Sequence, residues 1–253
     1  MKFKAIVTAL FCFVVLQAMA QQPAPDKVQT KKGDLVIRPV LHSSMVLSWD
    51  NKTIYVDPHG GATGFAGIAA PDLILLTDIH GDHLDLKTLD ALQTGKATIV
   101  APQAVADKLP EKYKQKLVVL QNGKSTTQLG IPIKAIPMYN LPETADAMHP
   151  KGRGNGYVLD LAGTKVYISG DTEDIPEMRS LKDIAVAFVS MNLPYTMPVE
   201  QAAKGVLAFK PKIVYPYHYR GKDGFSDVEK FKQLVQAKNK NIEVRLRDWY
   251  PEK

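Results

Sequence analysis

Residues 77–85 read Thr77-Asp-Ile-His-Gly-Asp-His-Leu-Asp85, and they follow the apolar run Asp72-Leu-Ile-Leu-Leu-Thr77. The apolar run predicts a buried strand that leads into a loop with two histidines and three aspartates. Imidazole and carboxylate are side chains that bind Zn²⁺ and its first-row neighbours. Crowding them into one turn costs desolvation and charge repulsion unless a cation is bound. The loop therefore predicts a metal site.

Outward from this loop, strands alternate with helices along the chain. The expected strands cover residues 35–40, 45–49, 53–57, 72–77, 97–101, 117–121, 131–138, 156–161, 165–169, 185–190, 212–217 and 242–246. The expected helices cover residues 86–93, 103–109, 175–180, 198–209 and 226–237. Turn signals predict hairpins at Asn122-Gly123 and across residues 162–164, and Ser226 is the expected N-cap of the last helix. This order favours sheets covered by helices, in one sandwich of two halves.

The N-terminus has the pattern of a secretory signal peptide. Residues 1–20 combine a basic head, an apolar stretch from Ala5 to Leu16, and Ala18-Met-Ala20 as a cleavage site. We expect 1–20 to be removed, 21–32 to be a flexible leader, and 33–253 to form a single domain. The expected location is periplasmic or secreted, with no stable membrane span after cleavage.

Composition excludes several classes of function. The single cysteine, Cys12, lies in the expected signal, so the mature chain would have no disulfide and no thiolate nucleophile. Removing Lys2 and Lys4 lowers the formal charge from +6 to +4, and the surplus is scattered. No basic stripe with interleaved aromatic residues appears, so we expect no nucleic-acid partner.

Other histidines and one further aspartate also follow expected strands. His42, His59 and His218 lie at or just after strand ends, and His149 lies in the long polar loop 139–155. Asp171 follows a strand in Ile168-Ser-Gly-Asp-Thr172. Loops at strand ends are where functional sites assemble, although any one of these residues alone is equally typical of a structural role.

Together these motifs resemble the metallo-β-lactamase-fold hydrolase superfamily. The chain shows Asp78-x-His80-x-Asp82-His83, then His149, Gly170-Asp171 and His218, in the order that the superfamily has. The resemblance implies an α+β fold, the four-layer αββα sandwich, with a metal site at one edge. Three further stretches resemble the branch with ascorbate-phosphate lactonase-like and N-acyl-phosphatidylethanolamine phospholipase-like proteins: Leu41-His-Ser-Ser44, Tyr55-Val-Asp-Pro58 and Asn192-Leu-Pro-Tyr-Thr-Met197.

The resemblance also implies roles for single residues. Asp78, His80 and His149 would hold a first metal ion. Asp82, His83 and His218 would hold a second ion, with Asp171 bridging the two. Asp82 and Asp171 are the expected catalytic carboxylates, and Asp57 would orient the metal loop by hydrogen bonds. His42 and Tyr195 are pocket candidates by resemblance, and Arg153 is one because its loop offers positive charge to an anionic substrate.

Asp78 departs from the superfamily, which usually has histidine there. We expect one or two divalent ions, Zn²⁺ first, with Mn²⁺ or Fe²⁺ as alternatives because carboxylate favours harder cations. Two ions would be balanced by three carboxylates and a hydroxide; alternatively Asp78 does not reach, and only the second site fills.

The expected function is hydrolysis of an ester, lactone or phosphodiester bond in a small molecule by a metal-bound hydroxide. No Gly-x-Ser-x-Gly motif offers a serine nucleophile. Two alternatives stay open: a catalytically silent metal-binding or scaffold protein of the same fold, and a β-lactamase, against which Asp78 argues. The sequence leaves the substrate and the oligomeric state open.

Overall fold

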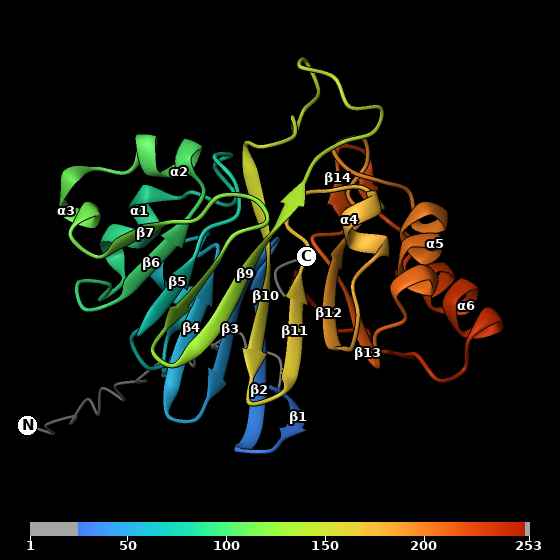
Figure 1. The fold of residues 1–253 in the computed structure, drawn as a ribbon, viewed down its shortest axis with the longest axis horizontal. Helices are drawn as coiled ribbons and strands as arrows, with labels where there is room; N and C mark the ends of the chain where they lie inside the picture. Colours follow the sequence, from blue (N-terminus) through green and yellow to red (C-terminus); the bar gives the residue numbers. More distant parts are fainter. Residues whose placement is uncertain (1–24, 251–253) are drawn as a thin grey trace, which may run out of the picture.

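The computed structural model describes residues 25–250, which form two seven-stranded sheets packed between helices (Figure 1). The expected signal peptide lies outside these residues. The first sheet contains, in spatial order, β1 (Asp26–Thr30), β2 (Gly33–Leu41), β3 (Ser44–Trp49), β4 (Lys52–Val56), β5 (Leu73–Leu75), β6 (Thr98–Ala101) and β7 (Leu117–Val119). The second contains β16 (Glu243–Val244), β13 (Ile213–Tyr217), β12 (Ile184–Ser190), β11 (Thr164–Ile168), β10 (Gly154–Leu161), β9 (Ile131–Met138) and β8 (Ser125–Gln128). A separate hairpin joins β14 (Arg220–Gly221) to β15 (Gly224–Phe225).

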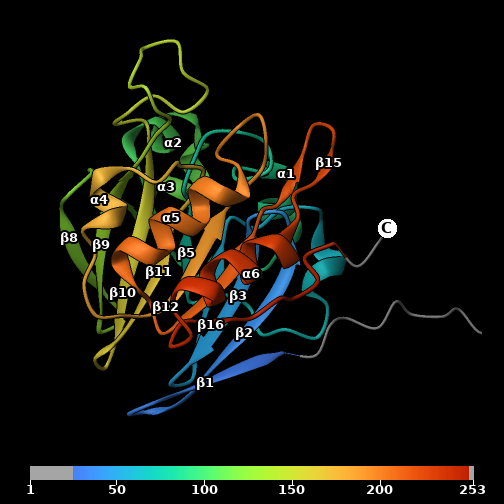
Figure 2. The same cartoon turned by 90° about the vertical axis from the view of Figure 1, so that its right-hand side faces the viewer.

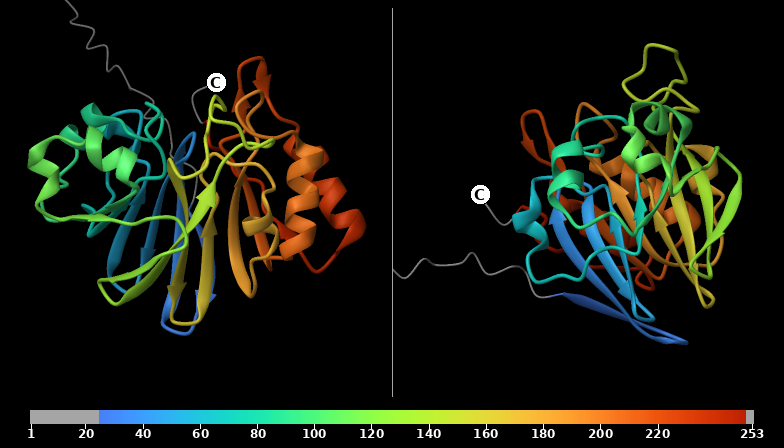
Figure 3. Two further views of the ribbon diagram at one scale, coloured as in Figure 1. Left: turned by 45° about the horizontal axis from the view of Figure 1, so that its top comes forward. Right: turned by 90° about the vertical axis from the view of Figure 1, so that its left-hand side faces the viewer.

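Helices cover the outer side of each sheet. The helices on the side of the first sheet, seen in the right-hand view of Figure 3, are α1 (Leu86–Ala91), α2 (Gln103–Lys108) and α3 (Glu111–Lys114). Those in front of the second sheet in Figure 2 are α4 (Pro176–Arg179), α5 (Val199–Phe209) and α6 (Val228–Lys238). A short 3₁₀ turn, η1 (Ala62–Phe65), lies between β4 and β5. The four-layer αββα sandwich expected from the sequence is confirmed.

The central strands of the first sheet are buried on both faces. Leu47 and Leu75 belong to the core between the sheets, whereas their neighbours Val46 and Ile74 belong to a second cluster with residues of α1 and α2. Strands covered on both sides read as continuous apolar runs instead of alternating ones. This burial explains why the run before the histidine loop is apolar throughout.

Strand direction brings the motif loops together. β4 and β5 are parallel neighbours in the first sheet, and β11, β12 and β13 are parallel neighbours in the second. The carboxyl ends of parallel strands meet at one edge of a sheet, where ligands commonly bind. Asp57, the loop 78–83, Asp171 and His218 follow these strands directly.

The N-terminal part of the domain corrects one expectation. Residues 26–30, expected in a flexible leader, form β1 and pair antiparallel with β2. Asp26 also accepts a hydrogen bond at 2.7 Å from the hydroxyl of Tyr215 in the opposite sheet, and it pairs with Arg245 and Arg247, which follow β16. Because β1 is a polar, half-exposed edge strand, its composition resembles that of a leader.

Other local expectations also change. Asn122-Gly123 makes a turn, with Lys124 N bonded to Gln121 O, but it links strands of different sheets and not a hairpin. The N-cap of α6 is Asp227, while the Ser226 hydroxyl bonds to Met191 O. β8, α3 and the β14–β15 hairpin were not predicted. Among residues 25–250, no helix is long and apolar enough to cross a membrane.

Candidate metal centre

A cleft of about 400 Å³ opens where the motif loops meet. Its lining includes His42, His80, Asp82, His149, Asp171 and His218, with Asn192, Tyr195 and Arg220 beside them. A larger groove of about 570 Å³ runs along β8–β11 and α4, but no histidine lines it. The histidine-lined cleft is therefore the candidate functional site.

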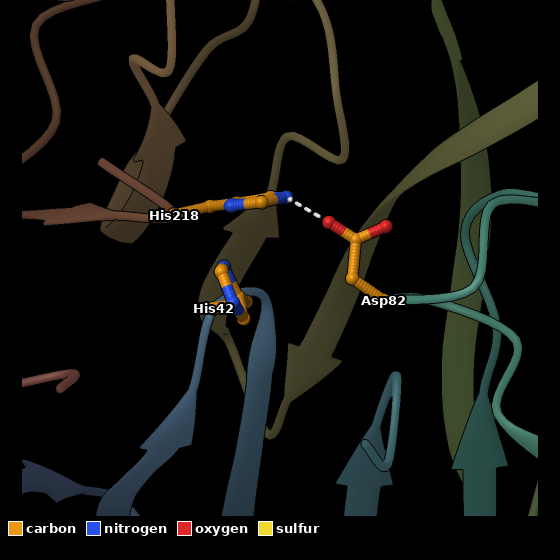
Figure 4. A group of neighbouring side chains, drawn as sticks. All are labelled: His42, Asp82 and His218. Atoms are coloured by element: carbon orange, nitrogen blue, oxygen red, sulfur yellow. Dashed lines mark ion pairs between the residues drawn. The ribbon is translucent and has the colours of Figure 1, made fainter. Parts of the chain in front are cut away.

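Within the described residues, three groups of side chains lie close enough to hold a metal ion. They are Asp78, His80 and His149; His83, Asp171 and His218; and His42, Asp82 and His218. The last group is drawn in Figure 4, where the Asp82 carboxylate points at His218, with Oδ2 3.2 Å from Nε2. The first two groups match the two expected ion positions, except that Asp82 reaches His218 and does not stand with His83 in one group.

His83 is held by a buried network of hydrogen bonds. Its Nδ1 lies 2.8 Å from Asp57 Oδ2 and 2.9 Å from Thr77 Oγ1. Asp57 in turn accepts hydrogen bonds from the Thr77 amide and hydroxyl. With Nδ1 occupied, Nε2 points toward Asp171 in the wall of the cleft and lies 3.5 Å from its Oδ2. This is the role expected for Asp57, since such partners fix the orientation of a ligating imidazole.

Hydrogen bonds with neighbouring segments also fix His149, Asp171 and His218. The Asn140 carboxamide oxygen accepts a hydrogen bond from the His149 amide at 2.7 Å and lies 3.1 Å from its Nδ1. The Tyr217 hydroxyl accepts a hydrogen bond from the Gly170 amide and so fixes the turn that presents Asp171. The His218 amide donates to His42 O, which ties the ends of β13 and β2 together.

Electrostatics keep the carboxylates ionised. Burial alone would raise the pKa of Asp78, but the hydrogen bond with His80 and the charges of His83, His80 and Arg153 lower it to about 2. Burial opposes ionisation of Asp171 too, yet His218 and His83 hold the pKa of that carboxyl well below its ordinary value. The pKa of Asp82 is likewise lowered by His218 and His83 against the effect of burial. All three are therefore anionic at neutral pH.

The imidazoles differ from one another. Burial lowers the pKa of His83, but the carboxylates of Asp171 and Asp57 outweigh it and raise that pKa well above its ordinary value. Burial and the neighbouring His218 lower the pKa of His42 to about 4, so His42 is neutral at pH 7. Burial also lowers the pKa of His149. A cation that binds His83 must compete with a proton there, so metal affinity should rise with pH.

Several buried donor atoms in and behind the cleft form no hydrogen bond, although some lie at ion-pair distance from a carboxylate. Among the described residues these include His83 Nε2, His149 Nε2, Asp171 Oδ1 and His218 Nε2. Buried polar atoms are rarely left unpaired, because desolvation without a new bond is costly. Imidazole nitrogen and carboxylate oxygen are what Zn²⁺ and similar ions bind. These residues thus fit a divalent cation.

Asp78 is different, because Arg153 already engages it. Arg153 Nε lies 3.0 Å from Asp78 Oδ1, and Nη2 lies 2.9 Å from Oδ2. Arg153 was expected in the substrate pocket; its guanidinium binds Asp78 and lies 3.4 Å from His80 of the cleft lining, so a role toward substrate stays a prediction. His42 and Tyr195 do lie in the lining.

Some residues of the site escaped the sequence analysis. Thr77, Asn140 and Tyr217 hold the histidines and the Gly170 turn, and Arg220 lines the cleft. Asn140 lies two residues and Arg220 three residues after an expected strand end, which is the signal that could have identified them. Thr77 and Tyr217 lie in predicted buried strands, where the sequence predicts a packing role and gives no sign of a hydrogen bond from the side-chain hydroxyl.

Comparison with known proteins agrees with this geometry. The family model described as the beta-lactamase superfamily domain matches residues 37–218. The chain belongs to this superfamily. It is 33% identical over 203 residues to a protein of Pyrococcus furiosus named UPF0173 metal-dependent hydrolase, covering 76% of this chain and 88% of the relative. The superfamily member described here is thus a metal-dependent hydrolase.

Solved structures agree as well. A protein of Parabacteroides distasonis assigned to the metal-dependent hydrolases superimposes with a TM-score of 0.78 and 41% identity, covering 89% of this chain and 98% of that one. A metallo hydrolase of Ignicoccus hospitalis shares the fold, with a TM-score of 0.70 and 24% identity over 84% of this chain and 94% of that one. The narrower branch suggested by the sequence stays a prediction.

Proposed function

We propose that this chain is a periplasmic or secreted hydrolase that cleaves an ester, lactone or phosphodiester bond in a small molecule. The observation that carries the proposal is the set of buried, unpartnered donor atoms of His83, His149, Asp171 and His218 around one open cleft. Bound there, a divalent ion such as Zn²⁺ would polarise the substrate oxygen and lower the pKa of a water molecule.

The chain's own residues prepare the cleft for this chemistry. Asp57 and Thr77 fix the His83 ring, and Asp82 and Asp171 stay ionised at neutral pH, which suits them to hold a cation and accept hydrogen bonds. Their lowered pKa values make both carboxylates weak proton acceptors, so we assign them to positioning and charge.

The rest of the lining favours a substrate with polar and apolar parts. Arg220 places a cation beside the histidines, while Asn192 and Tyr195 offer hydrogen-bonding groups. Met148, half exposed, lines the same cleft, and exposed Leu193 follows Asn192 in the chain. An ester or phosphodiester with an apolar substituent would use all of these groups.

The test uses the mature chain, stripped with a chelator and reloaded with Zn²⁺, Mn²⁺ or Fe²⁺. We expect reloading to raise the melting temperature and to restore hydrolysis of at least one member of an ester, lactone and phosphodiester panel. His218→Ala should lose both effects, whereas the exposed control Lys222→Ala should keep them. Metal binding without turnover on any substrate would favour the silent scaffold, and cleavage of a cephalosporin alone would favour a β-lactamase.

A further inference from the structure

The Asp78–Arg153 pair occupies a position where the superfamily usually has a metal-binding histidine. The Asp78 side chain is fully buried, the Arg153 side chain is 19% exposed, and two parallel N–H···O contacts of 3.0 and 2.9 Å join them. Bidentate, charge-assisted pairs of this kind are among the strong hydrogen bonds in proteins. The carboxylate is therefore already neutralised.

The metal-binding atoms of the two expected ion positions differ in the contacts that they already make. His83 Nε2, His218 Nε2 and Asp171 Oδ1 form no hydrogen bond within the described part of the chain. Their contacts, at 3.2–3.8 Å, are ion pairs between these imidazoles and the carboxylates of Asp82 and Asp171. Both Asp78 oxygens, in contrast, accept from Arg153, and Oδ2 also lies 2.9 Å from His80 Nδ1.

His80 is engaged on its other side too, because its Nε2 lies 3.4 Å from Arg153 Nη2. Of the first group, only His149 Nε2 is left without a partner. A cation among Asp78, His80 and His149 would have to displace the Arg153 guanidinium from Asp78. A cation beside His83 and His218 would meet only imidazole nitrogens and the carboxylates of Asp82 and Asp171.

Charge leads to the same conclusion. Asp78, Asp82 and Asp171 together carry −3, and the Arg153 guanidinium with one divalent ion carries +3. A second divalent ion on Asp78 would lie within about 5 Å of Arg153, given the 2.9 Å contact and a metal–oxygen bond of about 2.1 Å. Repulsion between these charges is strong in a partly buried site.

We propose that the Asp78–Arg153 pair takes the place of one metal ion, so that the cleft holds a single divalent cation. That cation lies with His83, Asp171 and His218, and the group of Asp78, His80 and His149 stays free of metal. The inference rests on the proposed function, since it presumes the metal centre.

Metal stoichiometry of the full mature chain tests this proposal without reference to activity. Protein stripped with a chelator is dialysed against excess Zn²⁺, and in parallel Mn²⁺, freed of unbound ion, and analysed by mass spectrometry of the metal. We expect one equivalent for the wild type and two for the double variant Asp78→His with Arg153→Met. The double variant removes the pair as a unit, so no unpaired buried charge remains.

Arg245→Met is the matched control, because Arg245 is also 19% exposed and pairs with an aspartate, Asp26, outside the cleft. It should bind one equivalent. Two equivalents in the wild type would overturn the inference and leave the proposed function standing, as would one equivalent in a folded double variant. No metal in the wild type would overturn both. If the double variant does not fold, the metal stoichiometry of the wild type and of the single variant Arg153→Met tests the inference. We expect Arg153→Met to bind two equivalents of metal.

Discussion

At the scale of single residues, the site depends on how each imidazole is turned. His83 can face the cleft with Nε2 only because Asp57 and Thr77 hold Nδ1. The sequence indicated His83 through the loop that follows an apolar run, and the resemblance to the superfamily indicated Asp57. It could not indicate Thr77, because a threonine in an apolar run carries no sign of which hydroxyl contact it makes.

Asp57→Asn tests this orientation. The substituted amide would place an N–H where the carboxylate now faces His83 Nδ1 and the Thr77 hydroxyl, so the ring would lose its fixed tautomer. We expect metal affinity to fall about 10–100-fold, measured by competition with a chromophoric chelator. Asp160→Asn is the control, because Asp160 caps a turn at Gly163; equal affinity in both variants would contradict the role of Asp57.

The contact between Asp78 and Arg153 could not be predicted from the sequence. The sequence marked Asp78 as a departure and Arg153 as a loop cation, but 75 positions separate them. The residues around each position do not indicate that the two side chains are in contact. Only the pairing of β9 with β10, and the Asn155 amide bonded to Thr77 O, bring the end of the loop beside Asp78.

At the scale of elements, β1 joins the two sheets through Asp26. Burial raises the pKa of Asp26, but the Tyr215 hydroxyl, the Lys27 amide, Arg245 and Arg247 outweigh it, so the folded pKa lies below the ordinary value of 3.8. A carboxylate with a lowered pKa contributes stability above its unfolded pKa, and the contribution is lost as the pH falls through the folded pKa.

Asp26→Asn should therefore lower the free energy of unfolding by about 1.5–3 kcal/mol at pH 7, as expected for hydrogen bonds to a charged group. The difference from the wild type should shrink as the pH falls below 3.8. Urea titrations across this range measure it. Asp34→Asn, whose partner Lys27 is exposed, should change stability by less than about 0.5 kcal/mol. A pH-independent difference for Asp26→Asn would refute the electrostatic explanation.

Strands with strong burial were predictable, and the polar edge strands β1 and β8 were not. Apolar runs located β2 to β6 and β9 to β13 within a few residues, because tertiary burial and local composition agree there. β1 and β8 are polar edge strands, so their pairing partners decide their structure more than their own residues do. Pairing partners also decide what a turn connects, so the sequence alone could not show that Asn122-Gly123 links strands of different sheets.

At the scale of the whole molecule, the order of strands and helices predicted the sandwich, and the motif order predicted the superfamily. The proposed location rests on residues 1–20, which lie outside the described part of the chain. We expect the full-length gene, expressed in a bacterium with two membranes, to yield a periplasmic protein that starts at Gln21.

N-terminal sequencing and cell fractionation measure this location. Ala20→Arg should block cleavage after residue 20, because signal peptidase requires small residues there, whereas Gln22→Ala should leave it unchanged. A wild-type protein that keeps Met1 would show that the segment is not removed.

The cleft draws its donors from both halves of the chain: His83 follows a strand of the first sheet, and Asp171 and His218 follow strands of the second. A cation shared by these side chains would cross-link His83 to His218, more than a hundred residues away, in a domain whose described residues include no cysteine. Closing so long a loop restricts the unfolded chain in the way a disulfide does, by about 4–5 kcal/mol in the chain-entropy treatment. Loss of the ion would then lower the stability of the packing between the two sheets as well as disrupt the metal centre.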